Sequence, residues 1–481
     1  MDLLSLLNYL PFYESKGEVN LTIQRVCNHS KLAKKGDLFI HKPKDKKAGQ
    51  MIVDEILSKG VDVILTPYAY DGVGSLTQII VPDVQAAEDL IALHFYQKPQ
   101  NKLGCIGVTG TNGKTTCTYL MKNMLEKLGF PSGLIGTVEY IVGDGTSTSS
   151  SHTTPDSLVI QDLLFQMCEN NLKYVVMEVS SHALVQRRVK DLLFDVAVFT
   201  NLTQDHLDYH SNMQEYAQAK ALLFKQSKKS VINKDSDVCD LMISYSREIF
   251  TYSIYKASDL QACDISLSDQ GSSFNLLYQG HKTSIKSPLV GLFNIYNLLA
   301  VIGVGLSLGF SLDHLQEICP DLKGAKGRLE LVDNSKGLKI FVDYAHTEDA
   351  LSNVLDTLNR LKKGRLILVF GCGGDRDRGK RSKMGAVAEQ KADMIFLTSD
   401  NPRSEDPASI IKDILSGIKS VEKVMIEPNR YEAIKNAIEM AKQSDLILIA
   451  GKGHETYQVI GNEYVPFDDK SVIKDICFHD S

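Results

Sequence analysis

Hydrophobic residues in the last third of the chain alternate between short continuous runs and segments with helical spacing. The continuous runs predict strands at 339–342, 366–370, 394–397, 423–426 and 446–450. The segments between them predict helices at 349–361, 383–390, 407–418 and 431–441. Strands that alternate with helices of this length indicate a doubly wound parallel sheet, with ligands bound at the carboxyl ends of its strands.

Two further regions precede this one. Residues 1–100 contain runs that predict strands at 36–40, 61–65 and 77–81 and a helix at 51–57. The middle of the chain contains runs that predict strands at 103–108, 172–177 and 194–200, a β meander over 250–290 and a helix after Pro288. Gly324 and Gly327 mark a hinge before the last region.

The predicted fold class is therefore α/β with three domains. We expect a small N-terminal α/β domain at 1–100, a central P-loop ATPase-like domain with a mainly parallel sheet at 101–325, and a C-terminal Rossmann-like doubly wound domain at 326–481. A length of 481 residues agrees with roughly three domains.

Composition narrows the class of protein. The net charge of -6 provides no basic footprint for nucleic acid. No basic segment precedes an apolar stretch at the start, and no run approaches the roughly 18 apolar residues of a membrane span, so we expect a cytoplasmic protein without membrane contact. The 9 cysteines form no Cys-x-x-Cys pair, which argues against a disulfide framework or a zinc knuckle.

A glycine-rich turn between a predicted strand and a predicted helix is the first candidate site. It reads Gly107-Val-Thr-Gly110-Thr111-Asn112-Gly113-Lys114-Thr115-Thr116. The usual rule for a phosphate-binding loop places a glycine five residues before Gly113, where this chain has Val108, and Gly110 supplies the flexibility instead. A plain glycine turn would not explain the Lys-Thr-Thr that ends it. We therefore predict a nucleoside triphosphate site, with Lys114 near the β and γ phosphates and the Thr115 hydroxyl on Mg²⁺.

Acidic and histidine residues follow the next two strands of the central region. Glu178 ends one strand, where such folds place a Mg²⁺ ligand. The other strand runs into a cluster of Asp205, His206, Asp208 and His210. A capped helix start and a zinc site are alternatives, but the mixture of aspartate and histidine beside a phosphate loop favours Mg²⁺.

Three further patterns of the first two regions are open to two interpretations. The GTP-selecting Asn-Lys-x-Asp is broken by Ser236, so adenine is favoured over guanine. Lys220 lies among apolar residues of a predicted helix and is expected to extend to water. The basic run 42–47 fits a solvated loop better than an anion site.

Polar clusters follow the strands of the last region. They read Asp343-Tyr-Ala-His346, Gly371-Cys-Gly-Gly-Asp-Arg376-Asp377, Asp400-Asn401-Pro402-Arg403 and Gly451-Lys-Gly-His-Glu455. Arg376 occupies the third glycine position of a dinucleotide fingerprint, which disfavours an NAD-dependent oxidoreductase. Parallel strands bring these clusters to one sheet edge, so we predict a ligand site there.

The phosphate loop, Glu178-Val-Ser-Ser-His, residues 200–210 and Asp343-Tyr-Ala-His, in this order and spacing, resemble the Mur ligases from about residue 101 onward. The resemblance implies an ATP-dependent ligase that joins an amino acid to a UDP-linked muramoyl peptide through an acyl phosphate, with ATP and Mg²⁺ as cofactors. It also implies small-molecule substrates and no nucleic-acid partner, and we expect a monomer.

The resemblance assigns roles to individual residues. The residues implied to hold ATP are Gly110, Thr111, Asn112, Gly113, Lys114, Thr115, Thr116, Asn294, Arg328 and Asp343. The residues implied to be catalytic are Lys114, Glu178, His206 and Lys220, and those implied to hold Mg²⁺ are Thr115, Glu178, His206 and Lys220 if it is carbamylated. A carbamylated Lys220 would be an anion instead of a cation.

The resemblance also implies two substrate sites. The residues implied for the UDP-muramoyl dipeptide are Ser30, His152, Thr153, Thr154, Ser180, Gln186 and Arg188. Those implied for the amino acid are Arg376, Asp400, Asn401, Pro402, Arg403, Gly451 and Glu455. The sequence Asp-Asn-Pro-Arg resembles the members that add meso-diaminopimelate, and the Arg403 guanidinium suits the second carboxylate of that amino acid.

The first domain departs from the family pattern. His29-Ser30-Lys31 stands where the family has Asp-Ser-Arg, and Lys46-Lys-Ala-Gly49-Gln replaces the family's Asp-Gly-His/Arg segment. The main prediction is addition of meso-diaminopimelate to UDP-N-acetylmuramoyl-L-alanyl-D-glutamate. The alternatives are a related ligase that uses another carboxylate carrier or adds L-lysine, and an ATP-driven binding module that uses the phosphate loop as a switch.

Overall fold

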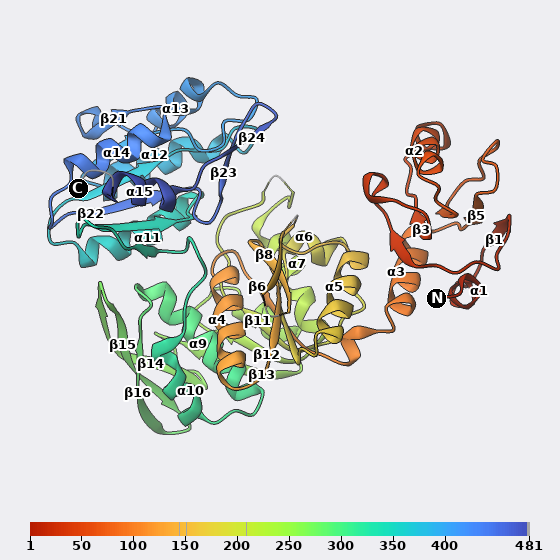
Figure 1. Cartoon of the computed structure of the whole chain (residues 1–481). Coiled ribbons are helices and arrows are strands. Elements are labelled where there is room, and N and C mark those ends of the chain that lie inside the picture. The colour runs from red at the N-terminus through yellow and green to blue at the C-terminus, as the bar shows by residue number, and fades with distance from the viewer. Residues whose placement is uncertain (144, 151, 208, 479–481) are drawn as a thin grey trace.

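The computed structural model describes residues 1–143, 145–150, 152–207 and 209–478. Its strands form sheets of 5, 11 and 6 strands and a separate pair of strands. The large sheets follow one another along the chain, and the central domain lies between the other two (Figure 1). The α/β fold class with mainly parallel sheets is confirmed, while the domain boundaries at 100 and 325 stay a prediction.

The N-terminal sheet has the order β1-β5-β4-β3-β2. Its elements are α1 (Leu3–Leu7), β1 (Glu14–Lys16), β2 (Arg25–Cys27), β3 (Asp37–Ile40), α2 (Lys46–Ser58), β4 (Val63–Thr66), β5 (Thr77–Ile80) and α3 (Val84–Phe95). The three predicted strands and the predicted helix are confirmed, although α2 begins five residues before the predicted start at 51. The basic run is therefore partly helical, and α2 is capped by the Asp45 side chain on the backbone N of Ala48. The sequence analysis did not identify α1, β1, β2 or α3.

The central sheet has the order β16-β15-β14-β13-β12-β11-β6-β10-β7-β8-β9. Its strands are β6 (Gly104–Thr109), β7 (Ser132–Ile135), β8 (Glu139–Gly143), β9 (Thr146–Ser149), β10 (Tyr174–Glu178), β11 (Phe194–Phe199), β12 (Ser227–Asn233), β13 (Glu248–Ser253), β14 (Leu260–Ser268), β15 (Gly271–Tyr278) and β16 (His281–Ser287). The helices are α4 (Lys114–Lys127), α5 (Ser157–Glu169), α6 (Ser181–Val185), α7 (Met213–Lys225), α8 (Cys239–Ser244), α9 (Leu292–Ser307) and α10 (Leu312–Ile318).

The central strands run parallel from β7 to β14, and antiparallel pairs extend both edges. The predicted meander is confirmed as β14, β15 and β16. Helices α4 and α9 bury their apolar side chains on one face of the sheet, and α5 and α7 do so on the other. The phosphate-loop strand β6 lies in the middle of the sheet between β10 and β11, so the ends of these three strands form one edge.

The C-terminal sheet has the order β17-β18-β22-β19-β20-β21. Its elements are β17 (Glu330–Val332), β18 (Lys339–Asp343), α11 (Glu348–Leu361), β19 (Leu366–Phe370), α12 (Gly379–Lys391), β20 (Met394–Leu397), α13 (Pro407–Leu415), β21 (Val424–Ile426), α14 (Arg430–Met440), β22 (Leu446–Ala450), β23 (Tyr457–Ile460), β24 (Glu463–Pro466) and α15 (Asp469–Phe478). All five predicted strands and four predicted helices are confirmed, with shifted helix ends. Helices α11, α12 and α13 cover one face, and α14 and α15 cover the other.

A buried arginine supports the loop that follows β19. The Arg381 side chain is 1% exposed and donates to Glu405 (2.9 Å), Asp413 (2.9 Å) and the Gly373 carbonyl (3.2 Å). Its hydrogen bonds lower the pKa of Glu405 to about 2 from an ordinary value of 4.5. The stabilisation is therefore fully present above pH 4.5 and is lost as the pH falls toward 2.

We expect Arg381→Met to lower the free energy of unfolding by about 2 kcal/mol near pH 7, because two carboxylates lose their buried partner. The difference from the unsubstituted chain should shrink as the pH falls below 4.5. Urea unfolding at several pH values measures both effects. Lys383→Met, which removes an exposed lysine 3.9 Å from Glu348, is the control and should change little.

Within the described part of the chain, no helix combines the length and the apolar character that a membrane crossing needs.

Candidate active site

The phosphate-loop turn uses two glycines for steric reasons. Gly110 has φ +149°, and a Cβ there would lie 1.9 Å from the Thr200 Oγ1 atom. Gly113 has φ +87°, and a Cβ there would lie 2.5 Å from the Asn297 Oδ1 atom. The turn can therefore approach the loop after β11 and the helix α9 only because both residues lack a side chain.

Two lysines converge on one carbonyl of this turn. The Lys114 Nζ atom donates to the carbonyls of Gly110 (3.0 Å) and Thr111 (2.8 Å), and the Lys220 Nζ atom donates to the Gly110 carbonyl (2.8 Å). Lys220 is 1% exposed and lies 4.3 Å from the centroid of the Tyr216 ring. The expectation that Lys220 extends to water is wrong, because the turn and Tyr216 enclose its amine.

Burial lowers the pKa of both amines. The pKa of Lys220 is lowered well below its ordinary value, first by burial and then by the nearby Lys114 charge. Burial also lowers the pKa of Lys114, which Glu178 partly opposes. A buried amine with a depressed pKa is a nucleophile, so Lys220 has the chemistry to react with an electrophile at this site.

Glu178 lies beside the start of α4. It ends β10, which pairs with the phosphate-loop strand β6. The carboxylate is fully buried and accepts from the Thr115 hydroxyl (3.0 Å), the Thr137 hydroxyl (3.0 Å) and the Thr137 backbone N (2.9 Å). A carboxylate and two hydroxyls next to a phosphate loop are oxygen ligands of the type that Mg²⁺ takes, so the donor set fits that ion.

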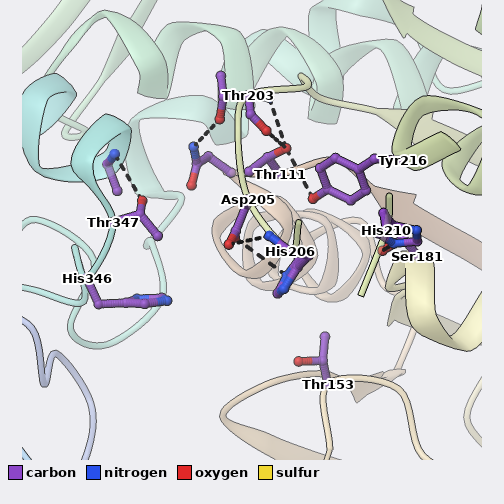
Figure 2. Close-up of polar contacts among 12 residues, drawn as sticks. Thr111, Thr153, Ser181, Thr203, Asp205, His206, His210, Tyr216, His346 and Thr347 are labelled. Atoms are coloured by element: carbon purple, nitrogen blue, oxygen red, sulfur yellow. Dashed lines mark hydrogen bonds and ion pairs between the residues drawn. The ribbon is translucent and has the colours of Figure 1, made fainter. Parts of the chain in front are cut away.

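The two histidines of the predicted Asp-His cluster contact different side chains. His206 pairs with Asp205 at 3.5 Å, whereas the His210 Nε2 atom lies 2.9 Å from the Ser181 Oγ atom (Figure 2). Asp208 lies outside the described residues. Among the residues that the structure does describe, no three His, Cys, Asp or Glu side chains gather into a metal-binding group.

A cavity of about 490 Å³ lies between the central and C-terminal domains. Its lining includes Asn112, Gly113 and Thr116 of the phosphate-loop region and Arg328 and Asp343 of the last domain. Among the other predicted nucleotide residues, Asn294 does not line the cavity, and its Oδ1 atom accepts from Asn297 (3.0 Å). Asn297, which was not predicted, is itself a lining residue.

Direct hydrogen bonds close this cavity at two points. Asn112 donates to Asp349 (2.7 Å), and the Arg328 guanidinium donates to the Thr115 hydroxyl (3.3 Å). Burial raises the pKa of Asp343, and the Arg328 charge opposes that rise. A larger hollow of about 610 Å³ lies at the opposite edge of the central sheet, and none of the predicted site residues lines it.

Most residues predicted for the dipeptide substrate lie around the end of β10. Thr154 donates to the Glu178 carbonyl (2.8 Å) and accepts from the Ser180 backbone N (3.0 Å), and the Arg188 guanidinium donates to the Thr154 carbonyl (2.7 Å). Further contacts join Thr153 to Thr137 (3.1 Å), Gln186 to Tyr209 (3.5 Å) and the His152 backbone to the Tyr140 hydroxyl (2.7 Å). Ser30 lies in the N-terminal domain, where its carbonyl accepts from Lys59 (2.6 Å).

The residues predicted for the amino acid lie at the carboxyl ends of β19, β20 and β22. The Arg403 guanidinium donates to the Gly374 carbonyl (2.7 Å), and Arg376 is on the same loop as Gly374. The Asn401 amide donates to Glu455 (2.9 Å). A Cβ on Gly451 would lie 2.4 Å from the Asp400 Oδ2 atom, so glycine is needed for the two loops to meet. Pro402 is buried beside them.

Sequence reasoning missed several residues that hold these loops. Thr137 binds Glu178, Asp349 joins the two domains, and Lys452 contacts Glu455 at 3.0 Å. Lys452 stands inside a predicted cluster, which could have drawn attention to it. Thr137 and Asp349 carry no comparable signal, because their partners come from distant parts of the chain.

The central and C-terminal regions of the chain match models of a known protein family. A family model described as the Mur ligase middle domain matches residues 108–305, and one described as the Mur ligase, glutamate ligase domain, matches residues 327–453. The chain is 44% identical over 468 residues to the UDP-N-acetylmuramoyl-L-alanyl-D-glutamate--2,6-diaminopimelate ligase of Caldanaerobacter subterraneus subsp. tengcongensis, covering 96% of each chain.

The same name is given to two further similar proteins. One is from Geobacillus kaustophilus and is 41% identical over 487 residues, which cover 98% of this chain and 99% of that protein. The other is a solved structure with 33% identity and a TM-score of 0.67, and the match covers 99% of both chains. The similarity thus extends through the N-terminal domain, including the segment with the altered motif.

Proposed function

Since the chain belongs to the Mur ligase family, we propose that it joins meso-2,6-diaminopimelate to UDP-N-acetylmuramoyl-L-alanyl-D-glutamate. ATP supplies the energy and leaves as ADP and phosphate. The observation that carries the proposal is the cavity between the central and C-terminal domains, which is lined by the phosphate loop on one side and by Arg328 and Asp343 on the other. The reaction belongs to the synthesis of peptidoglycan precursors.

The phosphate loop and the C-terminal domain together bind ATP in this proposal. Lys114 exchanges its two loop carbonyls for phosphate oxygens, and Asn112, Gly113 and Thr116 contact the nucleotide from the central domain. When bound, Mg²⁺ neutralises phosphate charge. Thr115 and Glu178 would hold one ion, and His206 and a carbamylated Lys220 would hold a second. Because Arg328 contacts Thr115 across the domains, closure of the C-terminal domain completes the site.

The chemical step needs positioning more than covalent work by the protein. A carboxylate oxygen of the muramoyl dipeptide attacks the γ phosphorus, and the bond to ADP breaks. The amine of diaminopimelate then attacks the carbonyl carbon of the acyl phosphate, loses a proton and expels phosphate. Thr153, Thr154, Ser180, Gln186 and Arg188 orient the dipeptide beside Glu178, and Ser30 contacts the UDP end.

The amino-acid site has charges of both signs. Arg376 and Arg403 would bind carboxylate groups, while Asp400 and Glu455 would bind ammonium groups. Diaminopimelate carries two groups of each kind, whereas L-lysine lacks the second carboxylate. The two arginines therefore favour diaminopimelate over L-lysine.

Phosphate release tests the proposed function. The purified protein is incubated with MgATP and UDP-N-acetylmuramoyl-L-alanyl-D-glutamate, and either meso-diaminopimelate or L-lysine is added. We expect strong release with diaminopimelate and only weak residual release with L-lysine, together with a product whose mass equals the sum of the muramoyl dipeptide and diaminopimelate less one water. Release with L-lysine alone would contradict the amino-acid assignment. No release with either would contradict the assigned carrier and direct attention to His29, Ser30 and Lys31.

Two glycines that flank α4 allow a matched test of the nucleotide site. Gly113 and Gly129 have nearly equal φ angles, +87° and +86°, but a Cβ clashes with Asn297 only at Gly113. Alanine at either position should cost about 1 kcal/mol of stability through backbone strain. We expect only Gly113→Ala to weaken ADP binding, by about tenfold, as measured by calorimetry. Equal binding by the two variants would argue against nucleotide contact at Gly113.

A further inference from the structure

Charges of alternating sign extend inward from the proposed amino-acid site. In order they are Glu455, Lys452, Asp400, Arg430 and Asp469. Lys452 and Asp469 are 0% exposed, Arg430 1% and Asp400 7%. Burial raises the pKa of Asp400, and the charges of Lys452 and Arg430 oppose that rise. Buried ions are costly unless they are paired. Lys452 is paired with Glu455 and Arg430 with Asp469, and the charges of both cations act on Asp400.

Lys452 contacts two predicted substrate residues at once. Its Nζ atom donates to the Glu455 Oε2 atom (3.0 Å) and to the Asn401 Oδ1 atom (3.1 Å). Asn401 also donates to the same Glu455 oxygen (2.9 Å) and accepts from the Val459 backbone N (3.0 Å). Lysine, amide and carboxylate therefore form a closed triangle of hydrogen bonds.

The triangle determines which atoms remain for a ligand. Both bonds to Glu455 end on Oε2, and no group of the described residues donates to Oε1. The Asn401 side chain uses its oxygen twice and its nitrogen once, so it acts mainly inside the protein. Glu455 is accordingly held by one oxygen while the other is available.

A second buried pair supports the same loops from behind. Arg430 and Asp469 are joined by two hydrogen bonds of 2.8 Å. Arg430 also donates to the Ala450 carbonyl (3.0 Å) and the Ser399 carbonyl (3.4 Å), which belong to the residues just before Gly451 and Asp400. The loops after β20 and β22 are thus joined twice, by Arg430 at the residues where the loops begin and by Lys452 farther along them.

We propose that Lys452 is a positioning residue for the amino-acid substrate: it holds Glu455 by Oε2 so that Oε1 meets an ammonium group of diaminopimelate. It also fixes Asn401, whose backbone carbonyl accepts from the Gly374 backbone N (2.9 Å) on the loop that Arg403 contacts. The inference rests on the proposed function, because it needs an amino-acid substrate at this site. Lys452 acts through Glu455 and does not touch the reacting atoms.

A double-mutant cycle on the full-length protein tests the proposal. Lys452→Met, Glu455→Gln and the double variant are compared in the phosphate-release assay, with diaminopimelate varied and ATP and the muramoyl dipeptide saturating. We expect each single variant to raise the KM for diaminopimelate about tenfold, with kcat and the KM for ATP within about twofold. The double variant should be about as impaired as Glu455→Gln alone, because Lys452 acts through that carboxylate.

Two more variants keep the test decisive. Lys362→Met removes a lysine paired with Asp393 (2.5 Å) in the same domain, away from the site, and should leave every constant unchanged. Lys452→Arg keeps the charge and should retain a KM within about threefold, which gives a result even where Lys452→Met fails to fold.

Several outcomes would overturn the proposal. One is a double variant whose rise in the KM for diaminopimelate is the product of the two single rises. Others are a fall in kcat at unchanged KM in Lys452→Met, or a rise in its KM for ATP as large as that for diaminopimelate. The last is a Lys452→Arg variant as impaired as Glu455→Gln. The unsubstituted protein separates this proposal from the proposed function. Phosphate release by that protein with unchanged kinetics in Lys452→Met refutes only the role of Lys452, whereas absence of diaminopimelate-dependent release refutes both.

Discussion

Lys220→Ala should nearly abolish ligation, with kcat lower by about 10³-fold and the fold retained. The reason lies in the position of the amine, which is buried, hydrogen-bonded to the Gly110 carbonyl and covered by Tyr216. With its pKa lowered well below the ordinary value, the amine can attack carbon dioxide and release a proton, which forms the carbamate that the family resemblance implies. Alanine removes that anion from the proposed second metal site.

Rescue distinguishes a carboxylate-like role from a structural one. Small carboxylates such as formate or acetate should restore part of the activity of Lys220→Ala, because they can occupy the space of the carbamate. Lys225→Ala, on the exposed end of the same helix, is the matched control and should remain active without additives. Full activity of Lys220→Ala, or inactivity that carboxylates do not relieve in a folded protein, would make the lysine structural. Mass spectrometry under mild conditions would detect the added carbamate directly.

The surroundings of the Lys220 amine could not be predicted from the local sequence. Its spacing among apolar residues predicts a buried helix face, and a lysine on such a face usually extends to water. The outcome depends on Tyr216 one turn earlier and on a carbonyl of a loop 110 residues away, which together enclose the amine. Periodicity reports which face is buried, but it carries no information on distant partners.

The parallel strands were predictable because their signals are local. Continuous apolar runs followed by glycine and polar residues identified the strand ends at Glu178, Asp343, Asp400 and Gly451, and parallel pairing brought those of each sheet to one edge.

The hairpin β23–β24 and the helix α15 were missed. The hairpin has exposed aromatic residues such as Tyr464, 70% exposed, and its contact with Arg403 is made by backbone atoms. Because any residue can make backbone hydrogen bonds, contacts of this kind cannot be recognised from the types of residue in the sequence.

The nucleotide cavity was predictable only in part. The phosphate loop was evident from its composition, and the family resemblance supplied Arg328 and Asp343. Asn297 was not among the predicted nucleotide residues, because an isolated asparagine near a helix start commonly caps the helix. In the fold its side chain lies against Gly113, a contact between positions far apart in the chain.

Arg403→Ala should raise the KM for diaminopimelate and lower kcat/KM by about 2 to 4 kcal/mol, which is roughly 30- to 10³-fold. Arg403 lies at φ +51°, with its backbone bonded to Val459 and Gly461 of the hairpin. Because alanine and lysine also carry a Cβ, Arg403→Ala and Arg403→Lys retain the same backbone strain. The side chain is held by the Gly374 carbonyl, so its charge is fixed at the edge of the site before substrate binds.

Comparing diaminopimelate with L-lysine tests whether Arg403 binds the second carboxylate, which only diaminopimelate carries. Arg403→Lys keeps the charge without the two-pronged guanidinium, so its kcat/KM should fall between those of the unsubstituted protein and Arg403→Ala. The KM for ATP should stay within about twofold in both variants, and the residual activity with L-lysine should change little, so the preference for diaminopimelate narrows. An equal loss for ATP and diaminopimelate would instead indicate general damage to the domain. A fall in kcat/KM that is confined to diaminopimelate would mean that Arg403 binds the carboxylate that L-lysine lacks.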